Sequence, residues 1–571
     1  MVKLLKIIFT SLLFFQISHC LNAQKSFELK FYIESPGGKV RVEDGGKIDS
    51  VYLEKAVSGK LNQLYYDGYL SASVREFEKD PSHLKCYIQK GELFQLTKLG
   101  PGNIEPTFLG SLGINVDSKK IKLTDLANIF KQVLDYSENN GYPFAIVKLD
   151  SIETEDHEIS ASLDLFRGPK IVYSKIKVIG YDKLKLPWLE NYLGVLEGKL
   201  YSEKQVKSIA DKLKELSFVR MDKTPEVRFT STTATIELSL TEKKVNNVDG
   251  VIGFLPNQKE DSKLLLTGSF NLHLFNLFST AKQLHIDWQK VNVNSQTLNT
   301  SFYYPQVFKM PLGFSFEFNL LKEDTIYLNR NSQLNIDFNL KPRHKIFFST
   351  VFENSSILGQ STITTENTAT FNDYKINYYG LVYKINALDD ALLPTSGSLF
   401  QLDAFTGSKK FSVPGENPSS EVEIKSTQFK MGTTFEHYFQ LASNYIVKFK
   451  IRSGNIIGEN IFTNDLFRIG GLRTIRGFNE NFFYLSDFVY SNLEFRIAQN
   501  SATYFFAFYD QGLVNNKLDG LGIDYPIGTG LGLSLGTKSG LFNLVIGIGK
   551  SRSQIFSLNS AKIHFGYVGR F

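Results

Sequence analysis

The chain has 571 residues and a formal net charge of +6, with 21% charged residues that are spread along its length without a basic block. This length exceeds that of a single compact domain, and the even spread of charge argues against a nucleic-acid partner. The 48 Phe and 27 Tyr, against 2 Trp, favour a strand-rich chain, and in a membrane barrel such residues also form the belts at the two interfaces.

Residues 1–23 have the parts of a secretory signal peptide. Two lysines precede an apolar stretch at 7–17, and the small residue Ala23 predicts cleavage before Gln24. The apolar stretch is shorter than the roughly 20 residues of a spanning helix, which disfavours a membrane anchor. Lipidation of Cys20 is the alternative, although the large residue before it fits such a site poorly.

Cysteine and histidine give no sign of a metal centre. After cleavage Cys86 is the only cysteine left, so no intrachain disulfide can form, and its alternating surroundings indicate an ordinary strand residue. The eight histidines are scattered without ligand spacing. We therefore predict neither a metal nor a cofactor.

Three related units follow the signal peptide, and we place them at 24–92, 93–170 and 171–244. The stretches YYDGYLSASV and ENNGYPFAIV align on Gly68 and Gly141, where an amphipathic helix ends at a glycine and a tyrosine leads into a strand. The strands expected after these glycines are 71–77, 84–89, 144–152 and 158–167. The third unit lacks the Gly-Tyr pair but has a helical pattern at 206–216 and a strand pattern at 234–240.

Each unit is therefore expected to contain a strand, one or two helices and two further strands. This order and the Gly-Tyr entry resemble the polypeptide-transport-associated (POTRA) domain, which occurs in tandem on the periplasmic side of outer-membrane assembly proteins. The first unit has no clear first helix, because 35–46 is glycine-rich. Three small α+β domains without an assigned purpose are the alternative interpretation.

From residue 245 to 571 helical periodicity disappears. Apolar and polar residues alternate, for example in 284–289, 314–320, 334–340 and 447–452, with acids and bases together on the polar face. This is typical of strands between lipid and a wet lumen, although a soluble sandwich would alternate in the same way. The length favours a transmembrane barrel, and at about 20 residues per strand with its turn it predicts 16 antiparallel strands. The polar stretches 361–372 and 407–420 are expected to be extracellular loops.

The stretch RIGGLRTIRGFNENFF, residues 468–483, stands out among these strands because it holds three glycines and three arginines. A cation at membrane depth is costly unless it points into a polar interior and finds a carboxylate. We therefore expect this stretch to be a loop folded back inside the barrel, with Arg476 held by acids of the inner wall.

Ile475-Arg476-Gly477-Phe478 resembles the sixth-loop motif of the outer-membrane assembly factor superfamily, which includes BamA, TamA and the two-partner-secretion transporters. Three further segments match the family in order: ALLPTSG at 391–397, SNLEFR at 491–496 and FYDQG at 508–512. The resemblance implies POTRA domains in front of a β-barrel.

In that family the loop arginine pairs with acids, which by motif are Glu494 and Asp510 here. The alternation in 489–497 independently places Glu494 on the lumen side, whereas 502–509 is aromatic on both faces and leaves the direction of Asp510 open. An ordinary ion pair lining a pore is the alternative.

The resemblance also implies a mechanism and partners: unfolded outer-membrane or secreted client proteins, outer-membrane lipid and accessory lipoproteins. POTRA edge strands would bind clients by β-augmentation. Glycines in the first and last barrel strands weaken their pairing and predict a lateral seam; they are Gly250, Gly253, Gly566 and Gly569. Many outer-membrane barrels end on an aromatic that their assembly machinery reads, and the corresponding residues are Phe565, Tyr567 and Phe571.

Four other functions are alternatives to this one. An enzyme is disfavoured because the chain has no HExxH motif and the Gly-Lys-Ser at 549–551 lacks the first glycine of a phosphate-binding loop. A passive porin would not need three repeats or an arginine loop. A two-partner-secretion transporter with one dedicated client remains open, as does a role in lipid or glycan transfer.

Overall fold

The computed structural model describes residues 26–79, 83–114, 123–256, 264–290, 294–341, 343–359, 371–390, 393–414, 421–537 and 540–570. The expected signal peptide, including Cys20, lies outside the described residues. The chain divides into two compact units, the first formed by 1–172, 198–204 and 229–234 and the second by 173–197, 205–228 and 235–571. Within the described residues, no helix combines the length and the apolar character needed to cross a membrane.

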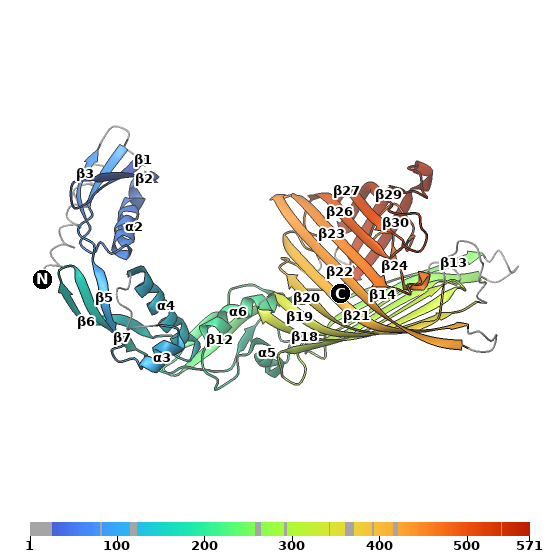
Figure 1. Cartoon of the computed structure of the whole chain (residues 1–571), viewed down its shortest axis with the longest axis horizontal. Helices are drawn as coiled ribbons and strands as arrows, with labels where there is room; N and C mark the ends of the chain where they lie inside the picture. Colours follow the sequence, from blue (N-terminus) through green and yellow to red (C-terminus); the bar gives the residue numbers. More distant parts are fainter. Residues whose placement is uncertain are drawn as a thin grey trace. The chain divides into compact units, whose positions relative to one another are not determined.

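The first sheet has the strand order β2-β1-β4-β3, and Figure 1 draws it in blue. Its elements are β1 (Ser26–Glu34), β2 (Val40–Asp49), η1 (Ser50–Tyr52), α2 (Leu53–Tyr66), β3 (Ser73–Lys79) and β4 (His83–Gln89). Helix α2 contributes Val57 and Leu64 to a core with Leu29 and Cys86. The glycine-rich stretch of this unit holds no first helix, because its second half forms β2 and pairs with β1 along nine residues of that strand.

The second sheet has the order β5-β7-β6, with β5 and β7 parallel. Its elements are β5 (Gln95–Gly100), α3 (Pro106–Ser111), α4 (Leu123–Asn139), β6 (Ile146–Glu155) and β7 (Glu158–Phe166). Gly68 after α2 and Gly141 after α4 have φ of +99° and +92°, the left-handed region that a glycine at the end of a helix supplies. Each helix therefore ends at a glycine that precedes a strand, as the aligned sequence stretches predict.

The third sheet is built around β12 (Thr233–Glu242), which pairs with β8, β9, β10 and β11. The other elements are β8 (Val172–Tyr173), β9 (Lys177–Ile179), α5 (Leu186–Leu193), α6 (Glu203–Lys214), β10 (Val219–Met221) and β11 (Glu226–Phe229). The helix expected at 206–216 and the strand expected at 234–240 correspond to α6 and β12.

Sixteen strands, drawn from green to red in Figure 1, form a closed antiparallel barrel, which confirms the predicted fold class and strand number. They are β13 (Asn247–Pro256), β14 (Leu264–Leu277), β15 (Lys282–Lys290), β16 (Gln296–Tyr304), β17 (Leu312–Glu323), β18 (Tyr327–Lys341), β19 (His344–Ile357), β20 (Tyr374–Asn386), β21 (Gly397–Pro414), β22 (Glu421–Ala442), β23 (Tyr445–Gly458), β26 (Asp487–Ala498), β27 (Tyr504–Asn515), β28 (Ile527–Gly536), β29 (Gly540–Lys550) and β30 (Lys562–Arg570). A short helix η3 (Leu558–Ser560) lies between the last two strands.

One expected loop is corrected by the barrel. Residues 407–414, expected to belong to an extracellular loop, are the second half of β21 and pair with β22 up to Pro414 opposite Glu421. The stretch alternates strictly, with Lys409 buried and Lys410 exposed, and such alternation is enough to continue a strand. Residues 360–370 and 415–420 lie outside the described part of the chain.

The barrel closes through a short ladder. Among the described residues, β13 pairs with β30 only at Asn247 opposite Arg570 and Val248 opposite Gly569, whereas the ladder between β13 and β14 runs through ten residue pairs. In the described residues, the first strand is therefore joined to the last by far fewer residue pairs than to its other neighbour, β14.

The buried thiol of the first sheet gives a direct test of that fold. Cys86 has no exposed surface, and burial raises the pKa of its thiol to about 12. Because the thiolate is the reactive form, we expect maleimide labelling at pH 8 to be slower by about a thousandfold or more in the native protein than in urea. A matched variant, Val42→Cys in a Cys86→Ser background, exposes its thiol and should label at once. Equal labelling rates of Cys86 with and without urea would contradict this core.

Candidate functional site: the arginine loop inside the barrel

The loop between β23 and β26 is folded into the lumen. It contains the short helix η2 (Thr463–Asp465) and a two-stranded sheet of β24 (Phe467–Ile469) and β25 (Phe483–Leu485). Ile475 and Phe478 at its tip have no exposed surface and pack with residues of β26 and β27, including Tyr490 and Val514. The tip is therefore held by the inner wall, as the charge of the loop led us to expect.

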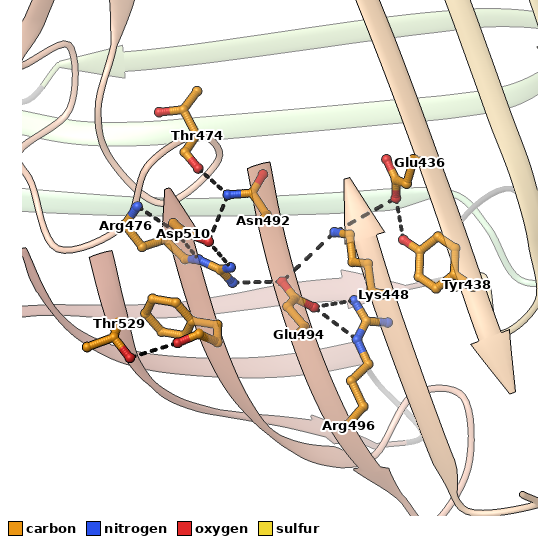
Figure 2. A network of polar contacts seen from close by, with 11 residues as sticks. Glu436, Tyr438, Lys448, Thr474, Arg476, Asn492, Glu494, Arg496, Asp510 and Thr529 are labelled. Atoms are coloured by element: carbon orange, nitrogen blue, oxygen red, sulfur yellow. Dashed lines mark hydrogen bonds and ion pairs between the residues drawn. The ribbon is translucent and has the colours of Figure 1, made fainter. Parts of the chain in front are cut away.

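Arg476 binds two carboxylates on adjacent strands (Figure 2). Its Nη1 donates to Glu494 Oε1 at 2.7 Å, while Nη2 and Nε donate to the two oxygens of Asp510 at 2.6 and 2.8 Å. The backbone N–H of Arg476 also donates to Asp510, at 2.9 Å. Asp510 thus accepts a bidentate, charge-assisted fork, the geometry in which arginine binds carboxylates most strongly.

Further charges complete the cluster around Glu494. Arg496 donates to Glu494 Oε2 through Nη2 at 2.7 Å and Nε at 3.0 Å. Figure 2 shows Lys448 of β23 between Glu494 and Glu436. Its Nζ lies 3.9 Å from the Glu494 carboxylate and 3.8 Å from the Glu436 carboxylate. The three cations therefore face three carboxylates, with Asp510 as the third. This balance matters because a buried charge without a partner is strongly destabilising.

Two uncharged side chains fix the position of the arginine. Asn492 donates to the carbonyl oxygen of Thr474 at 2.7 Å and to Asp510 at 2.8 Å, so it ties the loop backbone to the same carboxylate. The guanidinium carbon of Arg476 lies 3.8 Å from the centre of the Phe508 ring, a cation–π contact. Arg476 is thus hydrogen-bonded within the plane of its guanidinium and covered on one face.

Gly477 brings the loop backbone against β29. Its φ is +88°, and an added Cβ would lie 2.4 Å from the backbone carbon of Ile548, so no larger residue fits without movement. On β28, a Cβ at Gly528 would lie 2.0 Å from the carbonyl oxygen of Arg476. Gln554 donates to the Gly477 carbonyl at 3.0 Å. The glycines of the motif and of the wall therefore allow backbone-to-backbone contact.

The structure brings together all six residues assigned to the loop and its acids: Ile475, Arg476, Gly477, Phe478, Glu494 and Asp510. The direction of Asp510, left open by the sequence, is inward, and its side chain has no exposed surface. Asn492 and Phe508 received no role from the sequence. Alternation does place Asn492 on the lumen face, but hydrogen bonding to a loop carbonyl leaves no pattern in a sequence.

The four seam glycines do not form one cluster. Gly569 pairs with Val248 across the β13–β30 ladder, whereas Gly250 and Gly253 are registered with β14 and Gly566 with β29. Of the three aromatic residues of the expected C-terminal signal, the structure gives the backbone pairing of two. Phe565 and Tyr567 belong to the backbone ladder of β30 with β29, and Phe571 lies outside the described residues.

These features define a transmembrane β-barrel whose lumen holds an arginine loop. Residues 276–571 match the model of the Omp85 superfamily domain, and the chain belongs to that superfamily of outer-membrane β-barrel proteins. No curated protein matches the sequence in a direct comparison.

Solved structures resemble the chain at low sequence identity. CdiB from Escherichia coli is 13% identical, with a TM-score of 0.53 and coverage of 91% of this chain and 98% of that one. CdiB from Acinetobacter baumannii is 16% identical, with a TM-score of 0.48 and coverage of 91% and 97%. BamA from Haemophilus ducreyi lacking POTRA domains 1-3 is 16% identical, with a TM-score of 0.42 and coverage of 84% and 100%. The likeness to CdiB from Escherichia coli supports the fold.

Removing the arginine should destabilise the barrel. Arg476→Ala leaves Glu494 and Asp510 with fewer partners in a buried position, so we expect the free energy of unfolding in urea to fall by about 3–5 kcal/mol. Arg473→Ala is the matched control in the same loop, because its side chain is 79% exposed and makes one 3.3 Å contact with Asp287; its effect should stay below about 1 kcal/mol. Equal losses in the two variants would contradict the cluster's importance.

Adding one methyl group at the loop tip should displace it. Gly477→Ala places a Cβ against the β29 backbone, and we expect a loss of about 1–3 kcal/mol in unfolding free energy. Gly520→Ala is the control, since Gly520 also has positive φ, at +65°, but has open space around it. The difference between the two variants measures the close approach alone. No difference would mean that the loop adapts to the added methyl group.

Proposed function

We propose that this protein inserts client proteins into the outer membrane or translocates them across it. The observation that carries the proposal is the Arg476 cluster: the lumen holds an ordered loop bound to two carboxylates of the wall, and a lumen that served only as a wide passive pore would not require such a loop. Membership of the Omp85 superfamily supports the same class of function.

The N-terminal units are proposed to be POTRA domains in the periplasm, with boundaries at 24–92, 93–170 and 171–244. In support, the first sheet has β2 and β3 at its edges and the second has β5 and β6. An edge strand has backbone groups that can pair with an extended client segment. Unfolded outer-membrane proteins would be held in this way before they reach the bilayer, where accessory lipoproteins are candidate partners.

The seam between β13 and β30 is proposed as the site where a client strand is templated. Two residue pairs join these strands in the described part of the chain, and parting them would cost fewer hydrogen bonds than opening any long ladder of the wall. An incoming strand could then pair with the freed edge. The free energy would come from folding of the client in the bilayer, so the mechanism needs neither a nucleotide nor a catalytic residue.

A transporter for one dedicated secreted client is the second candidate. The likeness to CdiB from Escherichia coli spans 91% of this chain, but at 13% identity it concerns the fold and does not separate export from insertion. A passive porin is the third and would conduct ions steadily. A role in lipid or glycan transfer would leave membrane protein levels unchanged.

Depletion of the protein, followed by proteomics of the outer membrane, distinguishes these functions. We expect the levels of many barrel proteins to fall together. Loss of one secreted protein alone would favour the dedicated transporter, and an unchanged profile would refute both protein-handling functions. Unchanged protein levels together with altered outer-membrane lipid or glycan composition would favour the transfer role.

Complementation of the depleted strain tests the seam itself. Val248→Cys with Gly569→Cys places two thiols directly opposite each other across the seam, in a Cys86→Ser background. The oxidised variant should fail to complement and should recover with a reductant. The control pair, Val489→Cys with Leu513→Cys, lies opposite in the continuous ladder of β26 and β27 and should complement in both states. Full activity of the oxidised seam variant would contradict the templating step.

A further inference from the structure

The base of the arginine loop is bound to the wall by a second ion pair. Lys409 of β21 has no exposed side-chain surface, and the side chain of Asp465, the last residue of η2, is 1% exposed. Lys409 Nζ donates to Asp465 Oδ2 and, at 2.8 Å, to the carbonyl oxygen of Asn460. The rings of Phe462 and Tyr374 lie 4.0 and 4.4 Å from the same ammonium group. This lysine is therefore enclosed by loop and wall together.

Asn464, the residue before that acid, is hydrogen-bonded to three consecutive strands. Its Nδ2 donates to Ser355 Oγ of β19 at 2.6 Å. Its carbonyl oxygen accepts from Asn329 of β18 at 2.8 Å and from Tyr374 of β20 at 3.0 Å. The side-chain Nδ2 of Asn464 also donates to the carbonyl oxygen of Asn372, next to β20, at 2.8 Å. With Lys409 on β21, the loop base thus contacts four adjacent strands of the wall.

The two attachment regions lie on different parts of the barrel. Asn464 and Asp465 bind β18 to β21, whereas Arg476, eleven positions beyond Asp465, binds β26 and β27. Between them in the loop, Arg468 donates to the hydroxyl of Tyr327 on β18 and Arg473 reaches Asp287 on β15. The loop therefore extends between distant strands of the wall, with a buried ion pair near each end.

The burial of Lys409 favours one position of the loop over others. Taking both charges of an ion pair out of water offsets much of their attraction, so the pair adds little net stability over apolar residues of the same size. Once they are buried, however, every loop position that separates them leaves two unpaired charges. The best-attested role of such pairs is to select one arrangement among alternatives.

We propose that Lys409, Asn464 and Asp465 are positioning residues that form a second clamp, independent of Arg476, and that this clamp keeps the loop across the lumen as a closed plug. The inference goes beyond the proposed function, since it concerns the loop in the resting barrel and requires no client. Its failure would leave the proposal on client insertion untouched.

The test uses the full-length protein in lipid bilayers. Lys409→Met removes the charge at similar length, and Lys410→Met is the control on the next residue of the same strand, where the side chain is 51% exposed. Heat-modifiable migration on gels verifies that each barrel is folded. We expect Lys409→Met to raise single-channel conductance and Lys410→Met to leave it unchanged. Lys409→Arg, which retains the charge, should restore most of the closed behaviour.

A labelling measurement reports the loop position directly. Leu466→Cys, at a buried position next to Asp465, is placed in a Cys86→Ser background. Adding Lys409→Met should increase maleimide labelling of this thiol in folded barrels by about tenfold or more, since an unpaired buried charge costs several kcal/mol. Asn464→Ala keeps both charges and replaces Lys409→Met in these tests if the lysine variant does not fold. It should also raise the single-channel conductance and the maleimide labelling.

Combination with Arg476→Ala tests independence. Two separate clamps predict that the double variant conducts and labels more than either single variant. A double variant no different from Arg476→Ala alone would overturn the second clamp, and so would native conductance and labelling in both Lys409→Met and Asn464→Ala.

Discussion

The structure of the barrel interior depends on the pairing of Arg476 with two carboxylates. A guanidinium enclosed by protein needs acceptors for its donors, and here Nη1, Nη2, Nε and the backbone N–H each donate to a carboxylate oxygen. Because the acids come from two neighbouring strands, one loop position alone satisfies them together. A hydrogen-bond network of this kind converts a mobile connection into a fixed part of the wall.

The wall is shaped for that loop as much as the loop for the wall. Gly477 lies against the backbone of β29, and Gly528 of β28 lies against the carbonyl of Arg476. Glycine in a strand interior normally weakens a sheet, and close backbone approach is the recognised reason to keep it. The contact therefore exchanges some strand stability for a fit that no side chain would permit.

Much of this was predictable from the sequence. Alternation gave the barrel and the inward direction of Glu494, and the motif singled out Arg476. The side-chain direction of Asp510 could not be predicted, because its strand is aromatic on both faces. Phe505 and Tyr509 are exposed on the outer face. Phe508 covers the arginine inside. Two environments, lipid and a guanidinium, select the same residue type for different physical reasons.

The buried lysine shows where such reasoning stops. Lys409 and Lys410 are adjacent and identical, yet Lys409 is fully buried and Lys410 is half-exposed. The stretch was assigned to a polar loop because composition cannot tell a solvated lysine from one enclosed by distant partners. Its acid lies 56 positions away in the chain. Only the closed barrel brings these groups together.

Loop and seam together give the barrel an uneven stiffness. Side chains of the loop or of the wall link the loop to β15, β18 to β21, β26 and β27, and its backbone lies against β28 and β29. These contacts join strands that already share long ladders. In the described residues, two residue pairs join β13 and β30. Local opening follows the element with the fewest supporting contacts. Under the proposed function, a loop that stiffens long stretches of the wall would direct opening of the barrel toward its first and last strands.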